Sequence, residues 1–267
     1  MRIIQASLCF AALAPFTLYA QVQETGEEPA EERSSHWGIG VAGAIRSEIY
    51  AGEGNHSRVI PFVTYEGERL YWRGATVGYH LIERDGFVFG GFIAGRLDGV
   101  DADDFGVDEL ALRGIDRDLL EDRDDSADAG LSATWKGSAG EVELEFKADI
   151  TDTSGGYEAD FSYRYPLRFA GAMVTPSVGV TVLSKDMANY YYGTLDEEIA
   201  RGVVQYRPDS ATVPHVGIAV VKPFARRWRL IASAEYQVLP DEIKDSPLVK
   251  QDAGGVGRLF LGVSRGF

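Results

Sequence analysis

The chain has 267 residues, a formal net charge of −15 and a single cysteine, Cys9. Such an acidic balance excludes a general nucleic-acid-binding protein, which presents a basic surface to phosphates. Beyond Cys9 the chain carries no thiol, which excludes disulfides and thiolate metal sites from the rest of the protein.

The N-terminus has the features of a secretory signal peptide. Arg2 supplies a positive charge, residues 3–19 are mostly apolar, and Ala20 offers a cleavage site before Gln21. This apolar run is too short for a membrane-spanning helix, which needs about 20 residues. We therefore predict a cleaved signal at 1–20, a flexible acidic leader at 21–35 and a folded domain at 36–267.

Alternation of apolar and polar residues dominates this predicted domain. Val142, Leu144 and Phe146, for example, are separated by glutamates. A period of two predicts β-strands with one apolar and one polar face. Such segments occur at 37–45, 58–65, 70–82, 87–97, 127–136, 141–150, 157–167, 172–183, 213–224, 228–238 and 257–267.

The lengths of these segments suit a membrane barrel, whose strands need about 9–11 residues to cross at a tilt. Such barrels have an even number of strands, short periplasmic turns and longer outer loops. Eleven segments leave one strand missing, and the long polar stretch 98–126 could contain it at 107–112. The predicted fold is all-β, an antiparallel transmembrane β-barrel of about 12 strands, with ten as the alternative.

The same alternation would fit a soluble barrel or sandwich with its apolar face turned inward. Aromatic residues near strand ends, such as Trp37, Trp135 and Trp228, favour the membrane, because they would form interfacial girdles. Small or charged residues occupy the opposite face, as a narrow polar lumen requires. We therefore expect a protein of the Gram-negative cell outer membrane, in contact with the lipid bilayer and lipopolysaccharide.

The C-terminus is unusual because an alternating strand runs to the last residue. Leu259, Leu261, Val263 and Phe267 share one face. Such a strand must pair with the first to close a barrel, since an open edge in hydrocarbon is costly. A terminal aromatic is similar to the signal by which outer-membrane proteins are recognised for assembly, and we assign that role to Phe267. Arg265 departs from that pattern on the apolar face.

Several stretches resemble the MipA/OmpV (MltA-interacting protein) family of outer-membrane proteins. The segment 37–65 is similar to the family's opening, with a Gly-rich strand, a Tyr-x-Gly loop at Tyr50, and a basic residue followed by a Val-x-Pro strand at 58–61; Glu48 stands where the family often has proline. Further matching stretches are 74–96, 112–116, 190–194 and 245–249. The resemblance implies an outer-membrane barrel that brings a murein transglycosylase and a murein synthase together at the peptidoglycan. Other members of the family are surface proteins or adhesins.

Residues for catalysis or metal binding are sparse. The histidines are scattered, and His56 is the one that adjoins a serine, without a third group to orient it. The acidic stretch 98–109 matches EF-hand positions at Asp101 and Asp103, but Phe105 and Leu112 stand where ligands are required. We expect no catalytic site, no metal and no cofactor.

The tyrosine run Tyr190, Tyr191 and Tyr192 is the candidate partner-binding site, because three consecutive tyrosines cannot all face one way and exposed tyrosine is common at interfaces. The predicted function is that of a non-enzymatic scaffold linking murein hydrolase and synthase. Two alternatives stay open, a surface adhesin and a narrow solute pore. Glu143, Glu145, Asp160 and Arg164 would line such a pore.

Overall fold

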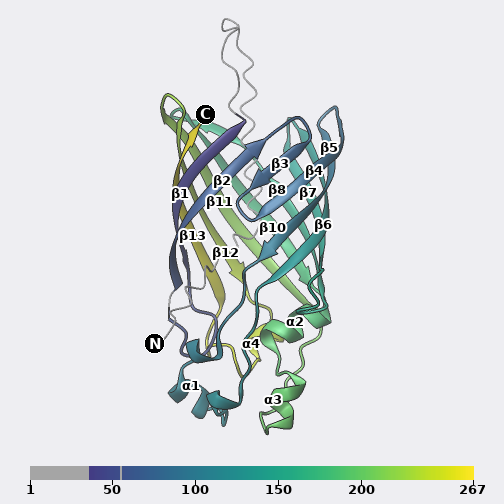
Figure 1. The fold of residues 1–267 in the computed structure, drawn as a ribbon, viewed down its shortest axis with the longest axis vertical. Helices are drawn as coiled ribbons and strands as arrows, with labels where there is room; N and C mark the ends of the chain where they lie inside the picture. Colours follow the sequence, from purple (N-terminus) through teal and green to yellow (C-terminus); the bar gives the residue numbers. More distant parts are fainter. Residues whose placement is uncertain (1–35, 55) are drawn as a thin grey trace, which may run out of the picture.

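The computed structural model describes residues 36–54 and 56–267. It shows an up-and-down β-barrel with a group of short helices at one end (Figure 1). The predicted signal peptide and acidic leader lie outside the described residues. No helix in the described part of the chain is long and apolar enough to cross a membrane.

The strands are long and mostly consecutive in space. They are β1 (Trp37–Arg46), β2 (His56–Glu66), β3 (Leu70–Arg73), β4 (Thr76–Arg84), β5 (Phe87–Arg96), β6 (Ser126–Gly137), β7 (Gly140–Asp149), β8 (Tyr157–Arg164), β9 (Leu167–Phe169), β10 (Ala172–Leu183), β11 (Ala211–Ala225), β12 (Trp228–Val238) and β13 (Gly255–Gly266). The helices are η1 (Ala102–Asp104), α1 (Val107–Ala111), η2 (Arg117–Leu119), α2 (Lys185–Tyr192), α3 (Asp196–Ala200) and α4 (Asp241–Lys244).

The ring contains twelve strands and is closed by the first and last of them. β8 and β9 both pair with the same edge of β10, so they form one strand interrupted near Pro166, and the thirteen segments make a wall of twelve. The closing ladder between β1 and β13 runs from Gly38–Gly266 to Arg46–Arg258. Closure by the last strand confirms the role predicted for the C-terminal segment, and the alternative of ten strands is wrong.

The twelfth strand is not where we expected it. The predicted single strand 70–82 is a hairpin of β3 and β4, with a turn at Gly74 and Ala75 in which Gly74 has a φ of 58°. The segment 107–112 instead contains helix α1, in which Gly106 is the N-cap, acidic residues occupy the first turn and Leu110 is the buried residue. Only Leu110 of this segment packs into the interior, whereas Val107 and Leu112 are 54% and 89% exposed.

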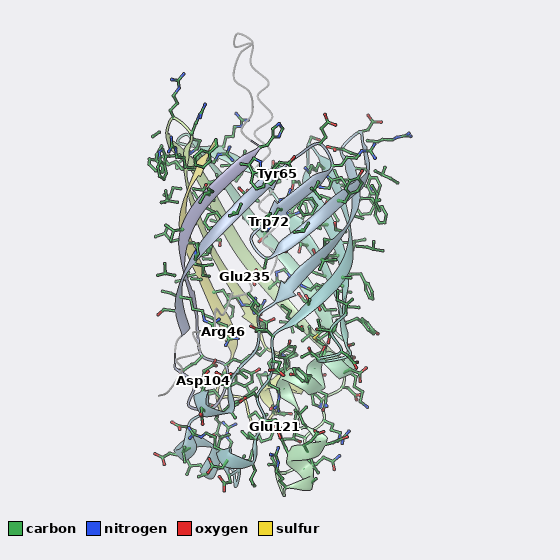
Figure 2. All side chains as sticks on the ribbon, viewed as in Figure 1. Arg46, Tyr65, Trp72, Asp104, Glu121 and Glu235 are labelled. Atoms are coloured by element: carbon green, nitrogen blue, oxygen red, sulfur yellow. The ribbon has the colours of Figure 1, made fainter. Side chains whose placement is uncertain are left out.

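The two ends of the barrel differ sharply in their connections. One end, here called the turn end, carries most of the short connections, the start of β1 and the C-terminus (Figure 1). The other end carries the connection 150–156 and four longer connections, 47–55, 97–125, 184–210 and 239–254; we call these four the cap. Figure 2 shows Tyr65 and Trp72 near the turn end, and Asp104 and Glu121 in the cap. In an outer-membrane barrel the long loops face outward, so the turn end faces the periplasm.

The side chains sort onto the two faces of the wall as the alternation predicts. Ile39 and Val41 of β1 project outward and are about half exposed. The next residue, Ala42, projects inward and is buried. Small inward residues make room for large ones on the next strand. A Cβ atom added to Gly40 would lie 2.3 Å from the ring of Phe62 and 2.7 Å from the carbonyl oxygen of Val263.

We expect Gly40→Ala to lower the free energy of unfolding by about 1–3 kcal/mol, because the added methyl group overpacks the lumen against a ring and a main-chain oxygen. Gly43→Ala is the matched control, since no atom lies within 4 Å of its added Cβ on the outward face. Urea unfolding of the protein in lipid vesicles measures both. Equal stability of the two variants would contradict this packing.

Candidate functional site: a capped, charged lumen

The lumen contains an elongated cavity of about 200 Å³. Its lining extends from Met187, Tyr191 and Ile243 in the cap to Glu141 and Met173 near the turn end. Charged side chains from β5 to β8 and from β12 and β13 form most of its polar surface. The prediction that Glu143, Glu145, Asp160 and Arg164 line the lumen is confirmed.

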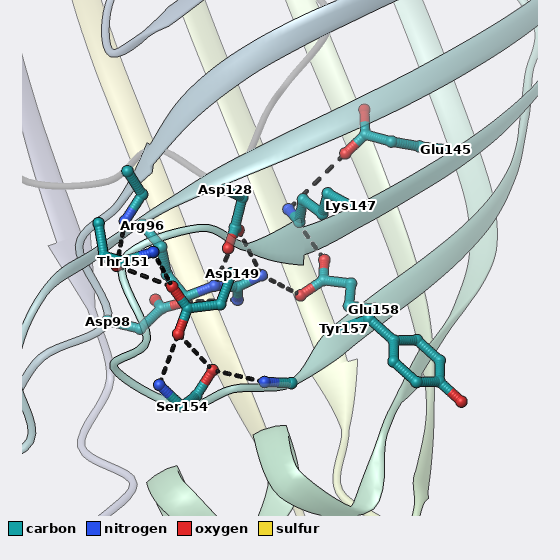
Figure 3. A network of polar contacts seen from close by, with 12 residues as sticks. Arg96, Asp98, Asp128, Glu145, Lys147, Asp149, Thr151, Ser154, Tyr157 and Glu158 are labelled. Atoms are coloured by element: carbon teal, nitrogen blue, oxygen red, sulfur yellow. Dashed lines mark hydrogen bonds and ion pairs between the residues drawn. The ribbon is translucent and has the colours of Figure 1, made fainter.

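Arg96, at the end of β5, is the centre of an extended ion-pair network (Figure 3). Its Nε lies 3.0 Å from Oδ2 of Asp128, and its NH2 group lies 2.7 Å from Oε2 of Glu158. Lys147 Nζ approaches the second oxygen of Glu158 at 2.9 Å and Glu145 at 3.7 Å. These residues come from four neighbouring strands, so the network ties β5 to β8 across the inside of the wall.

A second set of pairs lies beside the first. Arg164 of β8 contacts Glu143 of β7 at 2.8 Å. Asp160 accepts hydrogen bonds from Thr181 Oγ1 at 2.8 Å and contacts His215 Nε2 at 2.9 Å. Inward-facing positions on consecutive strands are direct neighbours along the ladder, which is why residues far apart in sequence meet here.

Neither Arg96 nor Lys147 was among the lumen residues predicted from the sequence. Arg96 is the last residue of a strand whose other residues, 87–95, are apolar or glycine on both faces. A single charged residue on the inward-facing side of such a strand indicates that an oppositely charged partner lies nearby in the lumen, because an unpaired buried charge would be costly. The identity of the partner, Glu158, has no signal in the sequence, since 62 residues separate the two.

The cap is a small hydrophobic core assembled from the four long connections. Its fully buried members come from all four loops and include Tyr50, Leu110, Met187 and Leu248. Main-chain hydrogen bonds join the loops, for example from Ala51 to Leu248 at 2.9 Å and from Gly106 to Ala51 at 2.8 Å. These contacts close the outer end of the lumen.

Arg123 and Glu198 form the buried electrostatic link of the cap. Their side chains are 1% and 0% exposed, and Arg123 NH1 lies 2.8 Å from Oε1 of Glu198. Arg123 also donates to the carbonyl oxygens of Tyr190 and Gly193, while Glu198 accepts from the amide of Leu195 at the start of α3. The pair thus joins the 97–125 loop to the 184–210 loop.

The three predicted partner-binding tyrosines lie on helix α2, in the cap. Tyr191 is buried and lines the lumen cavity together with Tyr192. Tyr190 is half-buried, and its hydroxyl accepts a hydrogen bond from the amide of Asp124 at 2.7 Å. Two of the three rings therefore face the lumen, and binding of a protein partner by this run stays a prediction.

Electrostatic effects at the junction of cap and lumen centre on Asp98. Burial disfavours its ionised form, but the guanidinium groups of Arg258 and Arg96 more than offset this and hold the pKa of Asp98 below its usual value. Burial, helped by the negative charge of Asp98, raises the pKa of Tyr192 to about 12. At neutral pH Tyr192 is therefore a neutral hydrogen-bonding group and Asp98 a carboxylate.

Phe267 lies at the turn end, beside the first strand. Its amide donates to the carbonyl oxygen of Trp37 at 3.0 Å, and the residue is 52% exposed. Arg265 projects outward as predicted, with its guanidinium 5.1 Å from the centre of the Phe267 ring and 6.0 Å from that of Trp228. These contacts account for a charged residue at the edge of the apolar belt. The assembly role of Phe267 stays a prediction.

No group of three or more His, Cys, Asp and Glu side chains is arranged to hold a metal ion within residues 36–54 and 56–267. The predicted loop histidine His56 is the first residue of β2. His215 faces the lumen carboxylate of Asp160, and His80 packs 4.9 Å from the ring of Tyr71.

A family model described as MltA-interacting protein MipA matches residues 39–267. The chain belongs to this MipA family. The match covers the barrel and the cap together, which confirms the family resemblance of the sequence motifs. Membership, together with the barrel itself, makes this a protein of the bacterial outer membrane.

Several outer-membrane proteins align over most of the chain. The outer membrane protein YiaT of Escherichia coli is 28% identical over 227 residues, covering 84% of this chain and 88% of that protein. The MltA-interacting protein of Escherichia coli is 28% identical over 211 residues, covering 78% of this chain and 81% of the relative. Among solved structures, an outer-membrane channel from Pseudomonas putida F1 is 14% identical, with a TM-score of 0.42, covering 91% of this chain and 100% of that one.

Proposed function

We propose that this MipA-family barrel is a non-enzymatic scaffold that docks a murein transglycosylase, and with it a murein synthase, at the periplasmic side of the outer membrane. The observation that carries this proposal is the closure of the lumen by the cap and by the ion pairs beneath it. A closed lumen favours protein docking over solute passage. The name of the Escherichia coli relative, MltA-interacting protein, supports a murein transglycosylase as the partner.

The turn end offers a surface suited to docking. The segments 165–173, 221–230 and 262–267 contain six cations and no acid, although the whole chain has a net charge of −15. Ladder pairing makes these segments neighbours on β9 to β13. We call this surface the basic rim; its exposed cations are Arg168, Lys222, Arg226, Arg227, Arg229 and Arg265. It would attract an acidic face of a partner protein.

Charge reversal on the basic rim tests this docking. We expect Arg226→Glu combined with Arg229→Glu to lower the yield of crosslinks between the membrane-embedded barrel and a purified murein transglycosylase at least tenfold, because attraction becomes repulsion at the interface. The matched control is Arg69→Glu combined with Arg84→Glu, which reverses two exposed charges at the opposite turns. Equal loss in both double variants, or no loss in either, would count against docking at the basic rim.

Planar-bilayer recording separates the scaffold from a solute pore. A capped lumen filled with ion pairs should give no steady single-channel current for the wild-type protein. Steady channels together with undiminished crosslinking in the rim variant would favour the pore in place of the scaffold.

A further inference from the structure

The wall of the barrel has an opening between β2 and β5. β2 pairs with β3 only through Thr64, Tyr65 and Glu66, followed by one hydrogen bond from the amide of Gly74 to Val63. The β3–β4 hairpin turns back there, far short of the cap (Figure 1). Within the described residues, no strand pairs with positions 57–62 on this edge. We call this gap the lateral opening; its borders are 57–62, the turn 74–75 and the end of β5 at 95–96.

The edge of β2 has the features of an unpaired strand. Because Val63 directs its main chain toward β3, alternation directs the main-chain groups of Val59 and Pro61 toward the opening. Proline has no amide to donate and is confined to such edges within sheets. Val59 is 79% exposed, whereas Val41 on the same outward face of the neighbouring strand is 52% exposed. The sequence and the exposure both agree with a free edge.

The lateral opening lies at the depth of the apolar belt. Pro61 is the ladder neighbour of Val41, and Ser57 that of Ile45; both β1 residues project outward and are exposed. An unpaired main-chain group in hydrocarbon costs several kcal/mol unless it lines a cavity or is buried by protein. The free main-chain groups of β2 at this depth must therefore line a cavity or be covered by another group.

Behind the part of the lateral opening nearest the turn 74–75 the interior is apolar, whereas Arg58 and Arg96 lie at its border with the cap. Ile60 is buried, and the ring of Phe62 lies 6.2 Å from that of Phe260. On the other border, Phe92 and Ala94 form a buried cluster with Tyr71. The lumen cavity reaches Ala94, Gly95 and Arg96, which belong to the β5 border.

We propose that the lateral opening admits an acyl chain of an outer-leaflet lipid from the bilayer into the lumen, where it packs against Ile60, Phe62 and Phe92. Hydrocarbon is the medium that contacts the wall at this depth, and the residues behind the opening match it chemically. Pairing with a second copy is disfavoured, since Pro61 removes a donor from the edge and the β3–β4 turn lies directly beside it. This inference is independent of the scaffold function.

Photocrosslinking of the wild-type protein tests this proposal. The protein is placed in vesicles whose phospholipid carries a diazirine on an acyl chain, irradiated, and its adducts are mapped by mass spectrometry. We expect adducts on the inward-facing Ile60 and Phe62 as well as on the outward-facing Val41. Ser233 is the matched inward residue behind the fully paired wall of β11 to β13, and should be labelled at least tenfold less than Ile60. Labelling of Ile60 no higher than that of Ser233 would overturn the proposal.

A variant with a longer hairpin tests whether the lipid enters through this opening. Eight residues inserted between Gly74 and Ala75, continuing the alternation, would extend β3 and β4 along the free edge. The adducts on Ile60 and Phe62 should fall at least tenfold while that on Val41 persists. Unchanged adducts would overturn entry by this route, and crosslinked dimers with unlabelled Val59 would assign the edge to a second copy. Should the variant not fold, the wild-type comparison of Ile60 with Ser233 still decides.

Discussion

Replacing Arg96 by methionine is expected to lower the free energy of unfolding by about 3–5 kcal/mol, the usual cost of removing one partner from a buried charge network. The substitution keeps most of the side-chain volume but leaves Asp128 and Glu158 without their shared cation. Asp128 is 1% exposed, so its carboxylate depends on the guanidinium to offset the cost of its burial. Urea unfolding in lipid vesicles, followed by the shift in gel mobility between folded and heated protein, measures the loss.

The matched control for this prediction is Arg201→Met in the cap. Arg201 pairs with Glu121 at 2.6 Å, but the two side chains are 37% and 46% exposed. An exposed pair contributes about 0–1 kcal/mol, so this variant should unfold almost like the wild type. Similar unfolding of the two variants would show that the lumen network is hydrated and contributes little to stability.

Replacing Arg123 by methionine is expected to open the cap without unfolding the barrel. Glu198 would become an unpaired carboxylate in a site that is fully buried, and the carbonyl oxygens of Tyr190 and Gly193 would lose their donor. Breaking a buried ion pair costs about 3–5 kcal/mol, and we expect this loss to be large enough to separate the loops of the cap. The loops 97–125 and 184–210 should then separate, since this pair joins them.

Two measurements follow the opening of the cap. External protease should cleave the 97–125 and 184–210 loops at least tenfold faster in the variant while the barrel keeps its heat-dependent gel mobility. Planar bilayers should also show current fluctuations that the wild type lacks. Arg207→Met, which removes an exposed pair with Asp196 in the same loop, is the control and should change neither. A protease-resistant, silent Arg123 variant would mean that the hydrophobic contacts of the cap suffice to close it.

The charges of the two ends give the molecule a polarity across the membrane. The 97–125 loop alone carries twelve acids and three arginines, whereas the basic rim at the turn end carries cations alone. An acidic outer surface and a basic periplasmic rim fit the scaffold proposal, because the rim is then the attractive surface for a periplasmic partner. The tyrosines of α2, being in the cap, would serve an outer partner and not a periplasmic one.

The sequence by itself determined the barrel. Its period of two placed Val142, Leu144 and Phe146 outward and the intervening glutamates inward, as the structure confirms. Strand length and the C-terminal run up to Phe267 indicated a closed wall in a membrane, and the motifs indicated the family. These features are local, because one strand shows its faces and its length without reference to its neighbours.

The β3–β4 hairpin shows where local patterning misled the prediction. Outward residues sit at even positions in Leu70 and Trp72 but at odd positions in Val77 and Tyr79, and Gly74 lies between. The apolar residues shift from even to odd positions at this point, and that shift was the available signal for a turn. It is easily missed because the segments before and after Gly74 both alternate regularly. The lateral opening follows from this short hairpin and from the length of β2 beside it.

Tertiary structure alone decided which residues meet in the lumen and the cap. Arg96 pairs with Glu158, and Arg123 pairs with Glu198, although each pair is far apart in sequence. The register of several strand ladders brings these residues together. The loops of the cap carry no periodicity, and their helices form because four separate segments bury Leu110, Met187 and Leu248 against one another. Such contacts depend on the closed ring that brings the loops together, and no single segment encodes them.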